Sequence, residues 1–164
     1  MNGHPKRFVL NGDAQVEQAP WCRMSWLCRP GMLDAKQLMV VRAEMPASKG
    51  HDFHCHPSME EVIYILEGTA EQWVGRERRT LNAGEIAHIP ANEVHATFNA
   101  SDRPLVFLAI LSPAIIDGPA LVDVSKEEPW RSLRNGNEWS TAGPQRPPNG
   151  RRRYPKALSC LEHL

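Results

Sequence analysis

Short apolar stretches, separated by glycine, proline and asparagine, constrain the fold of this chain most strongly. They carry β-branched and aromatic side chains and are too short for helical periodicity, which is typical of strands of about four to eight residues. They occupy 21–30, 37–45, 61–68, 70–75, 85–90, 94–99 and 104–111. Their close spacing favours an all-β sandwich or small barrel over alternating strand and helix units.

The composition changes beyond residue 112. The stretch 123–130 predicts one helical turn with Ser125 as its N-cap. The stretch 134–155 is rich in proline, glycine and arginine, and predicts an extended tail that lies along the barrel or is partly disordered. Arg151–Arg153 is a small footprint for an anionic partner, so a solvated tail is favoured. We therefore divide the chain into an N-terminal extension at 1–36, a barrel at 37–112 and a C-terminal part at 113–164.

The overall composition excludes several classes of protein. The 164 residues suffice for one domain, and 19 basic residues balance 19 acidic ones. A formal net charge of zero argues against nucleic-acid or membrane partners. No apolar run has the length of a signal peptide core or a transmembrane helix, so we expect a cytoplasmic protein.

The cysteines indicate a reduced protein. Their spacing includes no C-x-x-C pair, and nothing suggests secretion, so free thiols are expected. A bond between Cys22 and Cys28 is the less favoured alternative. The four cysteines are Cys22, Cys28, Cys55 and Cys160.

Potential metal ligands are concentrated in residues 51–61. Side chains alternate between the two faces of a strand, so His54 and His56 project together and Cys55 projects to the other face. This parity excludes Cys55 as a ligand. Pro57 is a turn residue that resets the register, so Glu61 can face the same interior from the next strand. Two imidazoles and one carboxylate suit a divalent transition metal.

A further histidine follows at a second strand boundary. Pro90 ends one strand, and Asn92 lies at a sharp turn where a positive φ is tolerated. His95 opens the next strand, and Thr97 and Asn99 share its face by alternation. His95 is therefore the fourth candidate ligand.

These residues resemble the two sequence motifs of the cupin superfamily. In the first motif, His54, Cys55 and His56 are followed after four residues by Glu61 and after six more by Gly68. In the second, Gly84 is followed by Pro90, Ala91, Asn92, His95 and Asn99 at the family's spacing. Two positions depart from the family pattern: Gly50 lies nearer to His54 than the family's glycine, and Asn92 replaces a glycine.

The resemblance implies a single jelly-roll barrel with one divalent transition metal inside it. The ligands would be His54, His56, Glu61 and His95. Iron, manganese, nickel, zinc and copper all fit this set, because side chains alone do not select among them. The resemblance also implies a homodimer, in which the N-terminal strand at 19–30 adds to the sheet of the partner.

Candidates for substrate binding come from the neighbouring strands. Arg42, if it faces inward, would hold a carboxylate, but an outward, solvated position is favoured. One of the pair Gln72 and Trp73 must point inward, and a tryptophan is more often core. His88 either supports the site or is simply packed. The weak candidates are Arg42, Gln72, Trp73, His88 and Thr97.

The surroundings of the site complete the prediction. His51 has the opposite parity to His54 and is expected on the surface or in a loop, and Glu60 is expected to face away from Glu61. The pocket should be mostly apolar, because its expected lining or packing residues are Met39, Val41, Ile65, Phe98 and Phe107.

Two classes of function fit these features. The first is a metal-dependent enzyme that acts on a small oxygen-rich organic molecule as a dioxygenase, isomerase, lyase or decarboxylase, with Glu61 as a catalytic base. The second is a non-catalytic barrel that binds or senses a small ligand. The intact ligand set argues against a metal-free structural barrel.

Overall fold

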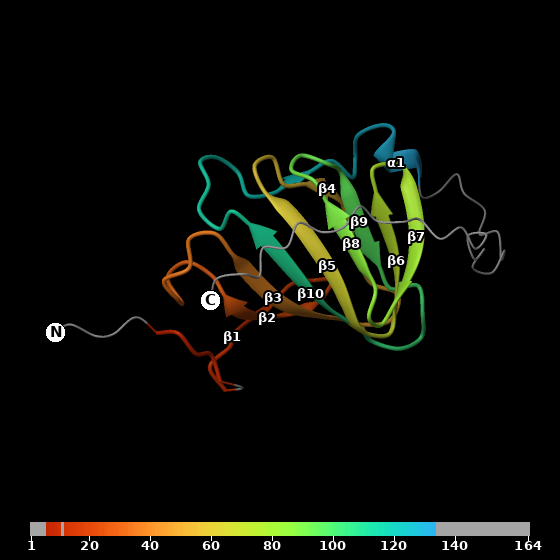
Figure 1. The fold of residues 1–164 in the computed structure, drawn as a ribbon. Coiled ribbons are helices and arrows are strands. Elements are labelled where there is room, and N and C mark those ends of the chain that lie inside the picture. The colour runs from red at the N-terminus through yellow and green to blue at the C-terminus, as the bar shows by residue number, and fades with distance from the viewer. Residues whose placement is uncertain (1–5, 11, 134–164) are drawn as a thin grey trace, which may run out of the picture.

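The computed structural model describes residues 6–10 and 12–133, which form two antiparallel sheets and one short helix (Figure 1). The six-stranded sheet has the order β1 (Gln15–Gln18), β2 (Arg23–Cys28), β3 (Met39–Met45), β10 (Leu105–Ser112), β5 (Glu60–Glu67) and β8 (Ile86–Ile89). The five-stranded sheet has the order β11 (Val122–Asp123), β4 (Gly50–Cys55), β9 (His95–Phe98), β6 (Thr69–Val74) and β7 (Glu77–Asn82). Helix α1 is Trp130–Leu133.

The main hydrophobic core lies on the inner face of the six-stranded sheet. Side-chain alternation places Val41, Ala43 and Met45 of β3 in this core, and Ile63 and Ile65 of β5 beside them. The intervening residues of these strands are half-buried or exposed. The same alternation carries Glu61 into the interior two residues before Ile63.

A second apolar cluster lies on the outer face of the five-stranded sheet, which is the face away from the four candidate ligands. Phe53, Trp73 and Phe98 are buried there, and Trp130 and Leu133 of α1 pack against them. The sheet is therefore covered on both faces. Its inner face is free to carry polar groups, because its outer face supplies much of the packing.

The helical turn predicted at 123–130 is wrong in position. Val122–Asp123 forms β11, which pairs with Cys55 and His54, and the helix begins at Trp130. The Asp123 carboxylate accepts a hydrogen bond from the backbone N–H of Ser125 at 2.8 Å. This local turn, rather than a cap by Ser125, starts the segment.

The all-β class is confirmed, but the two sheets are not joined into a closed barrel. The jelly-roll connectivity stays a prediction. Strands β1 and β7 were not among the predicted stretches, because exposed polar residues dominate both. The described residues contain no helix with the length and hydrophobicity to cross a membrane.

The N-terminal strand pairs within its own chain. β2 lies beside β3 in the same sheet, in an antiparallel register. Dimerisation and the domain boundaries at 36/37 and 112/113 stay predictions. Cys22, Cys28 and Cys55 are free thiols, as predicted. The predicted tail at 134–155, with Arg151–Arg153, and Cys160 lie outside the described residues.

Candidate metal centre

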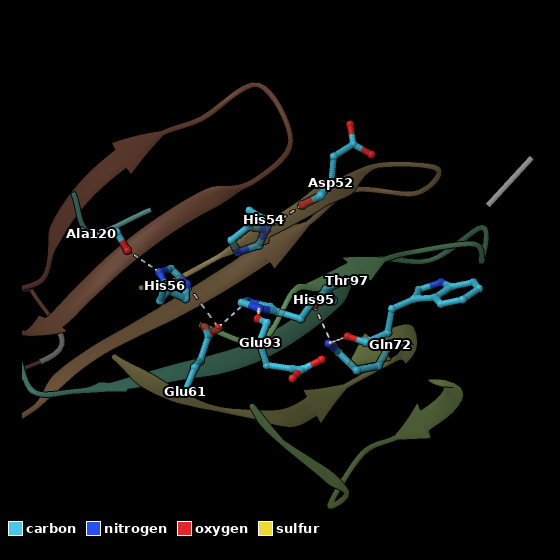
Figure 2. A network of polar contacts seen from close by, with 10 residues as sticks. Asp52, His54, His56, Glu61, Gln72, Glu93, His95, Thr97 and Ala120 are labelled. Atoms are coloured by element: carbon cyan, nitrogen blue, oxygen red, sulfur yellow. Dashed lines mark hydrogen bonds and ion pairs between the residues drawn. The ribbon is translucent and has the colours of Figure 1, made fainter. Parts of the chain in front are cut away.

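Three strands of the two sheets bring four potential ligands together (Figure 2). His54 lies on β4 and His56 directly after it, Glu61 lies on β5, and His95 opens β9. The potential ligand atoms all lie within 4.8 Å of one another, and all four side chains are buried. These are the four residues that the sequence motifs single out.

The turn between β4 and β5 places Glu61 opposite the histidines. Pro57 and Ser58 form the turn, and the Met59 N–H donates to the carbonyl of His56 at 3.4 Å. The carbonyl of His56 also accepts from the backbone N–H of Asn92 at 2.8 Å. This hydrogen bond joins the second cupin motif to the first beside the candidate ligands.

Each of the three imidazoles has its Nδ1 atom within hydrogen-bond distance of a backbone carbonyl. The pairs are His54 with Asp52 at 2.6 Å, His56 with Ala120 at 2.6 Å and His95 with Glu93 at 3.1 Å. A carbonyl can only accept, so each Nδ1 carries the proton. In the neutral rings, the Nε2 lone pairs are left for a ligand-binding role.

The chemistry of this donor set fits a cation. Glu61 Oε2 lies 2.8 Å from His95 Nε2 and 3.4 Å from His56 Nε2. Within the described residues, neither Glu61 Oε2 nor His95 Nε2 has a hydrogen-bond partner of acceptable geometry. Two facing acceptors that are buried together require a positive charge between them, either a proton on the ring or a metal ion. A divalent metal can satisfy all four groups at once.

Burial and charge set the protonation of these groups. Burial would raise the pKa of Glu61, but the neighbouring His56 and His95 outweigh it, and the pKa lies well below its usual range. Burial would lower the pKa of His56, but Glu61 and the Ala120 carbonyl raise it. Burial lowers the pKa of His54 to about 2. At neutral pH the site therefore offers an ionised carboxylate and at least one neutral imidazole, His54.

A cavity of about 310 Å³ opens onto the four ligands. Most of its lining is apolar, as the sequence predicted, and comes from β2, β3, β5 and β10 together with Ala120 and Leu121. His51 and Thr97 are the polar lining residues besides the four ligands. Such a site combines one polar centre with an apolar wall.

The prediction for His51 is wrong, because this residue lines the cavity. The pairing of β4 with β9 shifts register between His51 and His54, where the strand has a bulge or irregularity. One extra residue in a strand reverses the parity of the residues before it, so His51 shares the face of His54. Its ring stacks on Trp21, with centroids 4.1 Å apart, and lies 3.9 Å from the ring of His54.

The weaker candidates separate into two groups. Thr97 lines the cavity, and its hydroxyl donates to the side-chain oxygen of buried Gln72 at 2.7 Å. Gln72 does not itself line the cavity, but it holds Thr97. Trp73 is also buried, on the other face of the sheet, where its indole N–H donates to Glu71 at 2.8 Å.

The remaining two candidates lie outside the cavity. Arg42 is partly exposed and pairs with Glu44 at 3.2 Å, which matches the favoured outward position. His88 is exposed, and its Nε2 atom lies 3.1 Å from Glu60 Oε2. It therefore neither supports the site nor packs in the interior, and both predicted roles are wrong. In the pairing of β5 with β8, His88 lies opposite Val62. Val62 is on the outer face of β5, because its neighbours Glu61 and Ile63 are the buried residues. Glu60 faces away from Glu61, as predicted.

At the two departures from the cupin motifs, the backbone of this chain is left-handed. The family's first glycine falls at Ser48, which has a φ of 60°, and its other replaced glycine falls at Asn92, with a φ of 63°. These are the only non-glycine residues with positive φ in the described residues. Both positions therefore have a conformation that glycine adopts most easily.

The comparisons with known proteins agree with this geometry. A family model described as the cupin domain matches residues 41–111. The solved structure of an RmlC-like cupin from Shewanella frigidimarina superposes with a TM-score of 0.58 over 66% of this chain and 92% of that chain, at 19% identity. Residues 41–111 therefore form a cupin domain. The superposition at this identity supports the fold alone.

Two further matches carry names that describe a reaction. Quercetin 2,3-dioxygenase of Bacillus subtilis is 30% identical over 81 residues, which are 49% of this chain and 24% of the relative. The solved structure of DMSP lyase DddQ from Ruegeria pomeroyi superposes with a TM-score of 0.58, at 27% identity, over 70% of this chain and 62% of that chain. This cupin thus matches only about a quarter of the length of the dioxygenase.

Two contributors to the site could not be found from the sequence. Ala120 acts through its backbone carbonyl, which has no sequence signature. Trp21 reaches the site only because β2 folds against β3.

Proposed function

We propose that this cupin is a metal-dependent enzyme that acts on a small organic molecule bearing metal-binding oxygens. The observation that carries the proposal is the set of four buried ligands at an apolar cavity. Dioxygenase, isomerase, lyase and decarboxylase chemistry all fit such a site. The names of the two relatives, a dioxygenase and a lyase, support reactions of these types.

His54, His56, Glu61 and His95 would hold the metal. A bound divalent metal supplies a Lewis acid and, when it is iron, manganese, nickel or copper, redox chemistry. The backbone carbonyls of Asp52, Ala120 and Glu93 keep the imidazoles in one tautomer and orientation.

Glu61 is also proposed as the catalytic base. It is the only carboxylate among the described residues that line the cavity. To act as a base, Glu61 would have to leave the metal, and its Oε2 atom, which has no hydrogen-bond partner in the described residues, would then accept a proton from a bound molecule. The apolar walls would exclude water from that transfer.

Metal analysis of the purified, untagged protein by plasma mass spectrometry is the first test. We expect about one iron, manganese, nickel, copper or zinc ion per chain, as the single four-ligand site requires. His95→Ala should reduce the content to a small fraction, because it removes a fully buried ligand. His88→Ala is the matched control and should keep the metal, because His88 is exposed and pairs with Glu60.

Activity is then measured on the metal-loaded protein as oxygen consumption and product formation with catechol, enol and diketone substrates. Turnover that is lost in His95→Ala and kept in His88→Ala would support the enzyme. Metal retained in His95→Ala would refute the site. Tight binding of these molecules without any turnover would favour the non-catalytic binding protein instead.

A further inference from the structure

One wall of the cavity comes from a part of the chain outside the cupin match. Trp21, Met24 and Trp26 lie on β2 or just before it, and all three line the cavity. The family model begins only at Val41. β2 reaches the site because it pairs with β3 along the six-stranded sheet (Figure 1). The wall is therefore built by residues that lie outside the family match.

The wall carries no positive charge. Within residues 6–10 and 12–133, no lysine or arginine lines the cavity. Arg42, the sequence candidate for binding a carboxylate, points away and pairs with Glu44. A carboxylate that enters such a cavity loses its hydration and gains no cationic side chain in return.

Two stacked aromatic rings lie where the wall meets the candidate ligands. The rings of Trp21 and His51 are nearly parallel, with an interplanar angle of 8° and centroids 4.1 Å apart. His51 in turn lies against His54, with an interplanar angle of 32°. Both stacked rings also line the cavity, and aromatic surface that remains open to it favours planar apolar partners.

The size of the cavity limits the ligand. A cavity of about 150 Å³ is enough to hold benzene, and this one measures about 310 Å³. The space therefore suits about one or two rings. Thr97 already donates its hydroxyl hydrogen to Gln72, so toward a ligand it can only accept.

We propose that the cavity selects an uncharged aromatic molecule of one or two rings whose oxygens face the His/Glu cluster. Trp21 is the specificity-determining residue, and His51 holds its ring in place. This inference rests on the proposed metal site and adds the class of substrate to it. Aliphatic carboxylates would be poor ligands, because only the metal would compensate their charge.

Calorimetric titration of the zinc-loaded protein with catechol and with malonate tests the proposal. Zinc is chosen because it undergoes no redox chemistry, so that binding is measured without turnover. We expect catechol to bind more tightly than malonate. Trp21→Leu should weaken catechol binding about three- to tenfold, as expected for the loss of one aromatic contact. It should leave malonate binding unchanged.

Two variants serve as controls. Trp21→Phe keeps an aromatic face and should retain most of the catechol affinity. Phe8→Leu changes an aromatic side chain that is exposed and does not line the cavity, and should have no effect. Zinc content and melting temperature are measured for each variant, so that a loss of fold is recognised.

The outcomes separate the two proposals. Failure to bind zinc would refute the metal site, whatever the probes do. Zinc binding with tighter binding of malonate than of catechol would overturn only the inference about the substrate. Equal losses for both probes in a folded Trp21→Leu variant would overturn it as well. If Trp21→Leu does not fold, the comparison of the two probes on the unaltered protein decides.

Discussion

The pKa values of two buried side chains in this protein are shifted in opposite directions, because their neighbours differ. Glu61 is buried beside two imidazoles, which keep its pKa low and its carboxylate charged. Cys22 is buried in the main core, and burial, with a smaller contribution from the charge of Glu17, raises its pKa to about 12. The partner groups, and not burial alone, decide which residue can act as a ligand.

Cys22 should therefore resist alkylation in the folded protein. An unfolded thiol has a pKa of 9.0, against about 12 in the fold. Between pH 9.0 and about 12, the folded state thus keeps the Cys22 thiol proton that the unfolded state has lost. This contribution to stability is fully present below pH 9 and is lost as the pH rises to about 12. At pH 8.5 we expect iodoacetamide to label Cys22 about a thousandfold more slowly in the folded than in the unfolded protein.

Peptide mapping by mass spectrometry measures this labelling. Cys28, which is only half-buried, is the internal reference and should react in the folded protein. Rapid labelling of Cys22 under native conditions would contradict its placement in the core.

At the scale of elements, the contact between β4 and β9 positions two of the candidate metal ligands. His54 and His95 lie opposite each other in this pair, and Gly50 lies opposite Phe98 at its other end. The site thus depends on how closely the two strands approach. A Cβ atom at Gly50 would lie only 2.1 Å from the Phe98 ring, so only glycine allows the observed approach.

Gly50→Ala should destabilise the protein. The Phe98 ring is buried in the second apolar cluster and has little room to move, so we expect a loss of about 1–3 kcal/mol of unfolding free energy. Denaturant titration measures the loss. Gly12→Ala is the matched control, because nothing lies within 4 Å of the added methyl group. Equal stability of the two variants would show that β4 does not approach β9 as described.

At the scale of the whole molecule, the candidate metal centre joins the two sheets. Glu61 comes from the six-stranded sheet, whereas His54 and His95 come from the five-stranded sheet. The carbonyl of Ala120, from the segment after β10, holds His56. A bound ion would therefore link parts of the chain that no strand pairing connects.

Metal removal should lower the melting temperature. An ion at a hundred times its dissociation constant stabilises the fold by about 2.7 kcal/mol, which corresponds to about 5–10 °C for a chain of this size. Calorimetry before and after treatment with a chelator, followed by restoration of the metal, measures the shift. His95→Ala should melt at the same temperature with and without metal. An unchanged melting temperature of the unaltered protein would contradict a metal that bridges the sheets.

The sequence by itself determined the all-β class and the four residues that meet at the cavity. Both follow from local rules, because alternation and turn residues fix which side chains share a face. The open pair of sheets, the position of His51 and the wall around Trp21 were decided only by the tertiary structure. The irregularity in β4 reverses the parity of His51, and the pairing of β2 with β3 brings Trp21 across about thirty residues of chain. Such register shifts and long-range pairings leave no periodic trace in the sequence, because they depend on which strand lies beside which.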